Sequence, residues 1–245
     1  MRHVFRYLVE EVPSEGGRVT LAPEDAHHLL RVVRRGVGET VEVADGAGIR
    51  HRAEVVEAGE RVVVRVGERL PDLAPAPVLL GVGLMDAGRL DLVAEKAAEL
   101  GVAALVVVRS GRVRRTPEPD AWTRRAERLG RVVEAACRQC GRARLMPVEG
   151  LVPFAAIVAE TPGADGILID PRGGVALGDA LAARPPGSGP VTLLVGPEAG
   201  FAPEELDAAA AAGWTGAHLG PAVLRAETAA MAAATLACAA AGGLG

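Results

Sequence analysis

The sequence predicts an α/β protein in two parts, a small β-rich domain followed by a larger domain built on a parallel sheet. Residues 1–70 carry short β-like runs separated by turn residues. Residues 71–77 form a proline-rich stretch of the kind that separates domains. Across residues 78–245 apolar strand-like runs alternate with helical segments, which indicates parallel strands with both faces covered by helices.

Short apolar runs predict the strands of the first domain. Turn residues at Asp45-Gly46 and Gly59-Glu60 separate these runs and predict two hairpins. One short helix is predicted over residues 23–33. The predicted strands are 40–44, 50–57 and 61–66.

The strands of the second domain are predicted from apolar runs that are too short to be helices. Gly101 should end the first helix of this domain, and alanine, the strongest helix former, dominates the last one. Gly81 and Gly83 lie in a strand, but the third glycine comes at Gly88, so the spacing of a dinucleotide-binding loop is not met and a nicotinamide enzyme is discounted. The predicted strands are 78–84, 104–108, 166–170, 191–195 and 215–219, and the predicted helices are 90–100, 120–140, one that starts at 202–203, and 226–241.

The composition is that of a chain with a sizeable buried core and no membrane segment. Of its 245 residues 49% are hydrophobic, yet no apolar run approaches the ~20 residues of a membrane-spanning helix. The first residues lack a secretion signal and the three cysteines, Cys137, Cys140 and Cys238, do not form a disulfide framework, so we expect a cytoplasmic protein. Neither the Cys137–Cys140 pair nor the histidines of the first domain have a partner cluster, so no metal site is expected.

Two strands of the second domain end in glycine-proline turns. Gly196-Pro197 follows the run 191–195, and Gly220-Pro221 follows the run 215–219. In open α/β sheets ligands bind beyond the carboxyl ends of the strands, so the two turns together predict a pocket. The alternative is that both are ordinary turns and that the charged residues after them are solvated.

The residues of these two turns resemble a known family. Residues 196–201 read Gly-Pro-Glu-Ala-Gly-Phe, and residues 219–229 read Leu-Gly-Pro-Ala-Val-Leu-Arg-Ala-Glu-Thr-Ala. Together they are similar to the paired signature of the SPOUT methyltransferases that methylate N3 of a uridine in small-subunit (16S) ribosomal RNA. The resemblance covers nearly the whole chain, through 85–86, 95–96, 99–102 and 139–142. Three positions depart from the family pattern, which has glycine, serine and threonine where this chain has Ala199, Cys140 and Ala226.

The resemblance implies a fold, a cofactor and partners. The fold is a parallel-sheet SPOUT domain with a C-terminal trefoil knot, preceded by a PUA-like RNA-binding domain. The cofactor is S-adenosyl-L-methionine, and the partners are ribosomal RNA of the small ribosomal subunit and a second copy of the chain in an obligate homodimer. The residues expected to bind the cofactor are Leu194, Gly196, Pro197, Glu198, Gly200, Leu219, Gly220, Leu224 and Arg225.

Methylation of N3 sets the catalytic requirements. The neutral N3 has no free lone pair, so its proton must be lost to a base while negative charge on the uracil oxygens is stabilised. Glu198 and Glu227 are the acids placed to act as the base, directly or through water. Arg225 is expected to stabilise the charge that develops on the uracil carbonyl oxygens.

Arginines concentrate between residues 109 and 144, where eleven of them stand against four acids in a chain of formal net charge −4. A solvated helix face is the alternative, but too few acids are present to pair these arginines, so a footprint for RNA phosphates is predicted. The first domain has eleven arginines against twelve acids, so contacts there depend on where the arginines lie. The predicted RNA-binding residues are Arg2, Arg6, Arg31, Arg34, Arg112, Arg114, Arg115, Gln139 and Arg142.

Two other classes of function remain open from the sequence. One is a SPOUT enzyme of different specificity, such as a ribose 2′-O-methyltransferase; that group typically carries an asparagine in its last loop, and this chain contains no asparagine. The other is a non-enzymatic RNA-binding protein of ribosome assembly that has kept the fold.

Overall fold

The computed structural model describes residues 4–113, 116–185 and 188–243. The chain forms two compact units. The first contains Met1–Ala74 together with Cys137–Leu145, and the second contains Pro75–Ala136 and Met146–Gly245. The sequence predicted that residues 137–145 belong with the second domain, whereas their contacts place them with the first.

The first unit is a five-stranded sheet in the order β1-β3-β4-β5-β2. Both predicted hairpins are confirmed, because β3 pairs with β4 and β4 with β5 in antiparallel fashion. The predicted short helix is present as α1 (Pro23–His27), which continues into a π-helical turn at His28–Val32. The buried core includes Tyr7, Leu29 and Val43. The strands are β1 (Arg6–Leu8), β2 (Arg18–Thr20), β3 (Thr40–Ala44), β4 (Arg50–Ala58) and β5 (Val62–Arg69).

Arginine side chains hold residues 137–141, at the end of a long helix, within this unit. Arg138 Nη1 donates to the buried Asp25 Oδ1 at 2.7 Å. Arg6 Nη1 donates to the carbonyl oxygen of Arg138 at 2.7 Å, and Arg50 Nη1 donates to that of Gly141 at 2.9 Å. The carbonyls at a helix C-terminus carry partial negative charge and lack helical partners, so guanidinium donors stabilise them.

The second unit is built on a seven-stranded sheet in the order β10-β12-β9-β11-β6-β7-β8, and every neighbouring pair is parallel. The five strands predicted for this domain are confirmed with small changes at their ends. Because the faces of the sheet are covered, the central strands β6, β7, β9 and β11 are mostly buried, whereas β8, β10 and β12 are more exposed. The strands are β6 (Ala76–Gly83), β7 (Val102–Arg109), β8 (Val148–Pro153), β9 (Gly166–Ile169), β10 (Val175–Ala176), β11 (Val191–Val195) and β12 (Thr215–His218).

Four helices of the second unit were predicted and are confirmed. Asp86 caps the first by accepting a hydrogen bond from the backbone N–H of Arg89, and Gly101 ends it in a left-handed conformation with φ of 88°. In the part of the chain that the structure describes, no helix combines the length and apolar character needed to cross a bilayer. The four helices are α2 (Ala87–Leu100), α3 (Pro119–Cys140), α6 (Pro203–Ala211) and α7 (Ala226–Ala240).

The elements that the sequence did not predict are short. They are β1 and β2 in the first unit, and β8, β10, α4 (Phe154–Glu160), α5 (Leu177–Ala182) and a 3-10 turn at Gly163–Asp165 in the second. Strand β8 contains glycine and proline and lies at one edge of the sheet, while β10 has only two residues at the other edge. Strand β8 is not a continuous apolar run, and the other segments carry too few residues for a period to be recognised.

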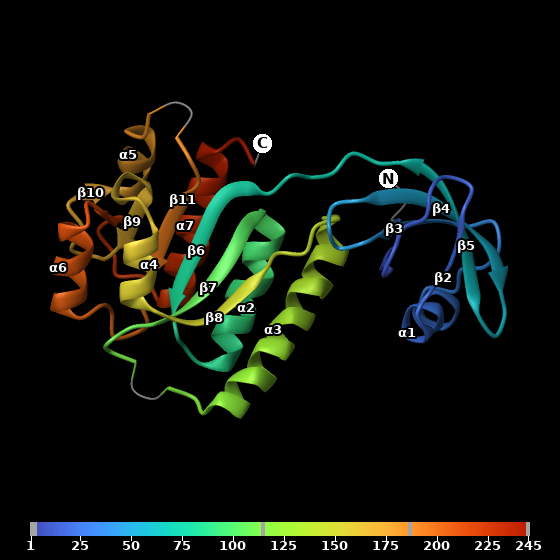
Figure 1. Ribbon diagram of the computed structural model, residues 1–245, viewed down its shortest axis with the longest axis horizontal. Coiled ribbons are helices and arrows are strands. Elements are labelled where there is room, and N and C mark those ends of the chain that lie inside the picture. The colour runs from blue at the N-terminus through green and yellow to red at the C-terminus, as the bar shows by residue number, and fades with distance from the viewer. Residues whose placement is uncertain (1–3, 114–115, 186–187, 244–245) are drawn as a thin grey trace. The chain divides into compact units, whose positions relative to one another are not determined.

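Helices cover both faces of the parallel sheet (Figure 1). Helix α7 contacts α2 and α5 on one face, and α4 contacts α6 on the other. A buried cluster between the sheet and the α4–α6 layer contains Leu168, Leu194, Phe201 and Trp214. The loops that leave the carboxyl ends of the strands therefore start from a rigid base.

Gly81 and Gly83 allow β6 to approach its neighbour closely. A Cβ atom on Gly81 would overlap the side chain of Leu194, and one on Gly83 would overlap the backbone and ring of Pro197. These glycines thus permit close packing of β6 against β11 and the loop that follows it, which is consistent with rejecting a dinucleotide-binding role.

We expect Gly83→Ala to lower the free energy of unfolding by about 1–3 kcal/mol, because the added methyl group has no space beside Pro197. Gly88→Ala is the matched control, because Gly88 is exposed in the first turn of α2 and has room for a Cβ. That variant should keep or slightly raise stability. Urea unfolding measures both values, and equal stabilities for the two variants would contradict the prediction.

Candidate functional site

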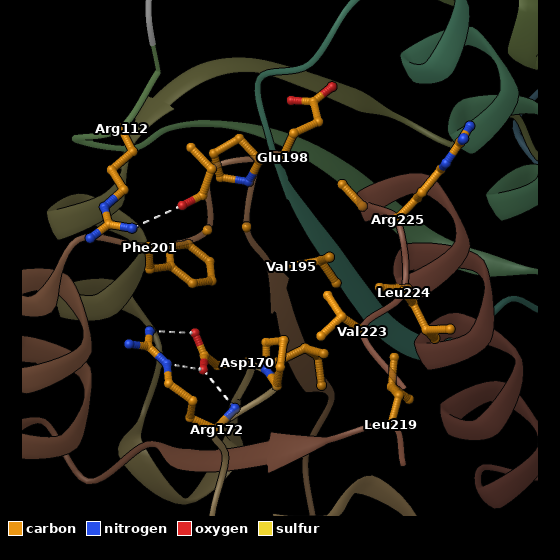
Figure 2. A pocket seen from close by; sticks show the side chains of 18 of the residues that line it. Arg112, Asp170, Arg172, Val195, Glu198, Phe201, Leu219, Val223, Leu224 and Arg225 are labelled. Carbon is orange, nitrogen blue, oxygen red and sulfur yellow. Dashed lines mark hydrogen bonds and ion pairs between the residues drawn. The ribbon is translucent and has the colours of Figure 1, made fainter. Parts of the chain in front are cut away.

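A cavity of about 660 Å³ opens at the carboxyl ends of β9, β11 and β12 (Figure 2). Three loops line it, at residues 169–172, 195–201 and 219–226. These strands are neighbours and parallel, so the loops after them meet at one edge of the sheet. Gly196 and Pro197 of the first glycine-proline turn and Gly220 of the second line this cavity.

The loop after β11 is a tight turn. The N–H of Gly200 donates to the carbonyl oxygen of Pro197 at 2.7 Å, and Gly200 has a positive φ of 69°. Ala199, which stands where the family pattern has glycine, has a negative φ and meets no conformational penalty. Its carbonyl oxygen accepts a hydrogen bond from Arg112 Nη1 at 3.0 Å. Replacement of that glycine by alanine is therefore compatible with the turn.

Eight of the nine residues predicted to bind a cofactor line the cavity, and Leu194 does not. The side chain of Leu194 is fully buried in the sheet and packs in the cluster with Phe201. Val195 lines the cavity instead, because successive side chains of a strand point to opposite faces. The other eight residues come from the loops after β11 and β12.

Asp170 and Arg172 form a polar edge of the cavity that the sequence did not predict. Asp170 Oδ1 accepts hydrogen bonds from the backbone N–H of Arg172 at 2.8 Å and from its Nε at 2.9 Å, and Oδ2 accepts one from Nη2 at 3.1 Å. These hydrogen bonds, partly offset by burial, hold the pKa of Asp170 below its usual value. The run 166–170 was predicted as a strand, so the acid at its carboxyl end, Asp170, was the signal from which a site residue could have been predicted.

Arg225 supplies a free cation at the cavity. It lies at the N-terminal end of α7, its side chain is exposed, and within the described ranges no residue pairs with its guanidinium. Glu198 and Arg225 both extend toward the upper margin of Figure 2, away from Asp170 and Arg172. The cavity thus carries charged groups on two separate sides.

Arg89 connects the two acids that the sequence proposed as bases. Its Nη1 donates to Glu198 Oε1 at 2.9 Å and lies 3.9 Å from Glu227 Oε2, while its Nε pairs with Asp86 Oδ2 at 2.9 Å. The side chain of Glu198 is 43% exposed, whereas that of Glu227 is only 12% exposed. Three carboxylates therefore share the guanidinium of Arg89. The sequence did not predict a role for Arg89.

A second cavity, of about 780 Å³, lies on the other side of the loop after β11. Both cavities are lined by Arg89, Arg112 and residues 197–199, which form the wall between them. Glu198 therefore lines both spaces, whereas Arg225 lines only the first and Glu227 lines neither.

The residues predicted to bind RNA differ in exposure and in pairing with acids. In the first unit Arg31, Arg34 and Gln139 are exposed and Arg142 is half-buried, and in the second unit Arg112 is exposed. The side chain of Arg6 is only 12% exposed and pairs with Glu42 at 2.7 Å. Arg2, Arg114 and Arg115 lie outside the described residues. Across the described ranges, no group of three or more His, Cys, Asp or Glu residues could hold a metal ion.

Comparison with protein families identifies the fold family. Residues 72–238 match the model of an RNA methyltransferase domain, and residues 21–66 match that of an RNA methyltransferase PUA domain. The chain belongs to this RNA methyltransferase family. The resemblance to SPOUT methyltransferases with a PUA-like domain is therefore confirmed.

Other proteins match this chain over most of its length. The ribosomal RNA small subunit methyltransferase E of Mycobacterium bovis is 31% identical over 232 residues, which cover 91% of this chain and 87% of that protein. The protein of that name from Synechocystis is 28% identical, and the match covers 92% of this chain and 74% of that protein. A similar fold is seen in the crystal structure of a ribosomal RNA small subunit methyltransferase E from Neisseria gonorrhoeae bound to S-adenosyl methionine. The TM-score is 0.86 at 28% identity, and the match covers 97% of this chain and 98% of that one.

The Asp170–Arg172 pair predicts a pH dependence of stability. Because the folded-state pKa of Asp170 lies below its unfolded-state value, the carboxylate stabilises the fold above an ordinary Asp pKa of about 3.9, and this contribution is lost as pH falls through the folded-state pKa. Asp170→Asn should therefore be less stable than the native chain at neutral pH, with a smaller difference at about pH 3. Urea unfolding at both pH values measures this. Asp179→Asn, at an exposed acid of α5, is the control, and an equal gap at both pH values for Asp170→Asn would contradict the prediction.

Proposed function

We propose that the protein transfers a methyl group from S-adenosyl-L-methionine to N3 of a uridine in 16S ribosomal RNA of the small subunit. The observation that carries the proposal is the cavity built from the two signature loops, at 196–201 and 219–229, in a chain of the RNA methyltransferase family. The names of the relatives from Mycobacterium bovis and Synechocystis support ribosomal RNA as the substrate. The cofactor bound in the Neisseria gonorrhoeae structure supports S-adenosyl-L-methionine.

The cavity fits this cofactor in size and chemistry. Gly200 and Gly220 have positive φ values of 69° and 112°, and an added Cβ on either would meet open space, so bare backbone faces a ligand there. Val195, Leu219 and Leu224 provide apolar surface for the adenine ring. When bound, S-adenosylmethionine supplies a methyl group on a positively charged sulfur, which becomes a neutral thioether as the methyl is transferred.

Glu198 is the proposed base for the N3 proton of the uridine. It lines both cavities, so it can reach an acceptor on one side of the loop and the cofactor space on the other. Its pairing with Arg89 orients the carboxylate at the wall between them. Glu227 lines neither cavity and is proposed to hold Arg89 in place. Transfer of the proton to Glu198, directly or through water, frees the N3 lone pair for attack on the methyl.

Arg225 is the proposed group that stabilises negative charge on the uracil. Loss of the N3 proton spreads charge over the two carbonyl oxygens, which an unpaired guanidinium can meet with two donors. The free side chain of Arg225 at the mouth of the cavity is available for this contact without breaking another. Such a contact strengthens as charge develops and therefore acts on the rate more than on binding.

RNA binding is proposed for the exposed basic residues. Arg31, Arg34 and Arg112 are exposed and suited to phosphate contacts, and Gln139 and Arg142 extend this set. Arg2, Arg114 and Arg115 remain predictions from the sequence. Arg6 is left out of the proposed RNA surface because it already pairs with Glu42 and with the end of α3. A protein with this substrate is expected in the cytoplasm with the small ribosomal subunit.

A homodimer is proposed on the face formed by α2 and α7. Leu92 of α2 is 37% exposed and Leu236 of α7 is 44% exposed, and the two helices pack against each other. A second copy would bury this apolar surface. The trefoil knot that the family resemblance implies stays a prediction.

Cofactor binding and RNA modification test the proposal together. Gly220→Val should abolish S-adenosylmethionine binding in calorimetry, because a β-branched side chain resists the positive φ of the turn and would fill the cavity. Gly242→Val is the matched control, since Gly242 also has a positive φ, at 72°, but lies outside the cavity. Mass spectrometry of 16S RNA treated with the native chain should show a uridine methylated at N3. Ribose methylation, or no modification, would contradict the proposal.

We expect Arg225→Ala to lower kcat by about 100- to 1000-fold while RNA affinity changes little, as for loss of a donor to a developing oxyanion. Lysine at this position should restore only part of the rate, because it lacks the planar fork of the guanidinium. Arg128→Ala is the control, since Arg128 pairs with Asp91 outside both cavities. Steady-state kinetics with an RNA substrate measures the effect, and a raised KM with unchanged kcat would refute the assigned role.

A further inference from the structure

We propose that the second cavity, between the loop after β11 and helices α2 and α3, holds the acceptor nucleotide. The target base would lie on the apolar surface of Leu84, Met85 and Ala121, with one carbonyl oxygen facing Arg125 and the other directed toward the first cavity, which Arg225 lines. The inference rests on the proposed methyl transfer and adds to it the site and the residues that receive the substrate.

Transfer between two bound molecules requires two adjoining spaces. The reacting atoms must approach to about 3–3.5 Å in line, so the acceptor has to enter from a space that borders the cofactor cavity. The second cavity meets this condition, because residues 197–199 separate it from the first and Arg89 and Arg112 line both. The turn at Pro197 is short, and Ala199 contributes only a methyl group as its side chain.

The lining of the second cavity suits a single flat base with oxygen acceptors. Leu84 and Met85 are buried and supply an apolar floor, and Ala121 of α3 adds little bulk. Arg112 and Arg125 also line this cavity and provide donors for carbonyl or phosphate oxygens, whereas Arg89 is paired with neighbouring acids. The chain has few aromatic residues, so apolar contact and arginine donors must replace base stacking.

Arg125 is an incompletely paired cation in this cavity. Its Nη2 donates to the carbonyl oxygen of Met85 at 2.5 Å, which fixes the guanidinium at the cavity wall. Within the described part of the chain no carboxylate lies within ion-pair distance of it, and its Nε is buried without a hydrogen-bond partner. Burial lowers the pKa of Arg125, although Asp91 and Asp86 act in the opposite direction. Negative charge on a bound uracil or phosphate would offset this cost of burial.

Arg89 links the second cavity to the proposed base. Its contacts with Asp86 and Glu198 place the carboxylate of Glu198 at the edge that both cavities share. A uridine in the second cavity would therefore present N3 to the acid proposed to take its proton. The proton then moves to Glu198, the methyl bonds to N3, and the cofactor leaves as a neutral thioether.

Filling the cavity tests the inference without touching the cofactor site. Ala121→Trp places a large side chain in the second cavity only, because Ala121 does not line the first. We expect kcat/KM for an RNA substrate to fall by at least about 100-fold, because a displaced acceptor loses its alignment, while the Kd for S-adenosylmethionine stays within about twofold of the native value. Thermal melting of each variant checks that the fold is retained.

A matched pair of arginine variants provides the second measurement. Arg125→Ala should lower kcat by about tenfold or more, because it removes a charge-assisted donor from the acceptor. Arg124→Ala removes an equal charge from the next residue of α3, which is exposed and lines neither cavity, so its kcat should be native. Any effect of Arg124→Ala on RNA affinity should disappear at high salt.

The outcomes separate the two proposals. Native kcat/KM in Ala121→Trp and native kcat in Arg125→Ala, with the native chain methylating uridine, would overturn the acceptor site and leave the proposed function standing. A native chain that binds no S-adenosylmethionine would overturn both. Loss of cofactor affinity in Ala121→Trp would also overturn the acceptor site, because it would show that the second cavity belongs to the cofactor.

Discussion

The parallel pairing of β9, β11 and β12 is the constraint on which the candidate site depends. Parallel strands bring their carboxyl ends to one edge, so loops that begin at residues 169, 195 and 219 line a single cavity. Strand β6 can lie directly against β11 because Gly81 and Gly83 have no side chains at the contact. A larger residue at Gly83 would move the loop at Pro197 and with it the wall between the two cavities, and one at Gly81 would displace the side chain of Leu194.

The arginine side chains at this edge of the sheet differ in whether they pair with acids. Arg172 satisfies Asp170, and Arg89 is shared by Asp86, Glu198 and Glu227, so these guanidiniums are committed to neighbouring acids. Arg225 has no such partner within the described residues and is exposed. Paired arginines hold carboxylates in fixed orientations, whereas an unpaired one is available to a substrate. This division is the physical reason for assigning positioning to Arg89 and charge stabilisation to Arg225.

The arginine-rich block between residues 109 and 144 has a mixed role. Arg128 pairs with Asp91, Arg138 with Asp25 and Arg144 with Asp72, so part of the positive charge stabilises the protein itself. Arg112 is exposed and lines both cavities. A charge count over this block therefore overstates the surface available to RNA, because the acids that neutralise the arginines come from distant parts of the sequence.

The sequence by itself determined the two-part α/β architecture, most strands and helices of the second unit, and the two turns that line the cavity. Apolar periodicity, proline and glycine act locally, so these features are readable residue by residue. Short elements such as β8 and α4, the burial of Leu194 and the grouping of residues 137–145 with the first unit were decided by the tertiary structure. The same is true of the contact between Arg89 and Glu198, which are 109 positions apart and meet at 2.9 Å. Such a contact exists because β6 and β11 are neighbours in the sheet, and strand order depends on packing between distant segments, which no local pattern records.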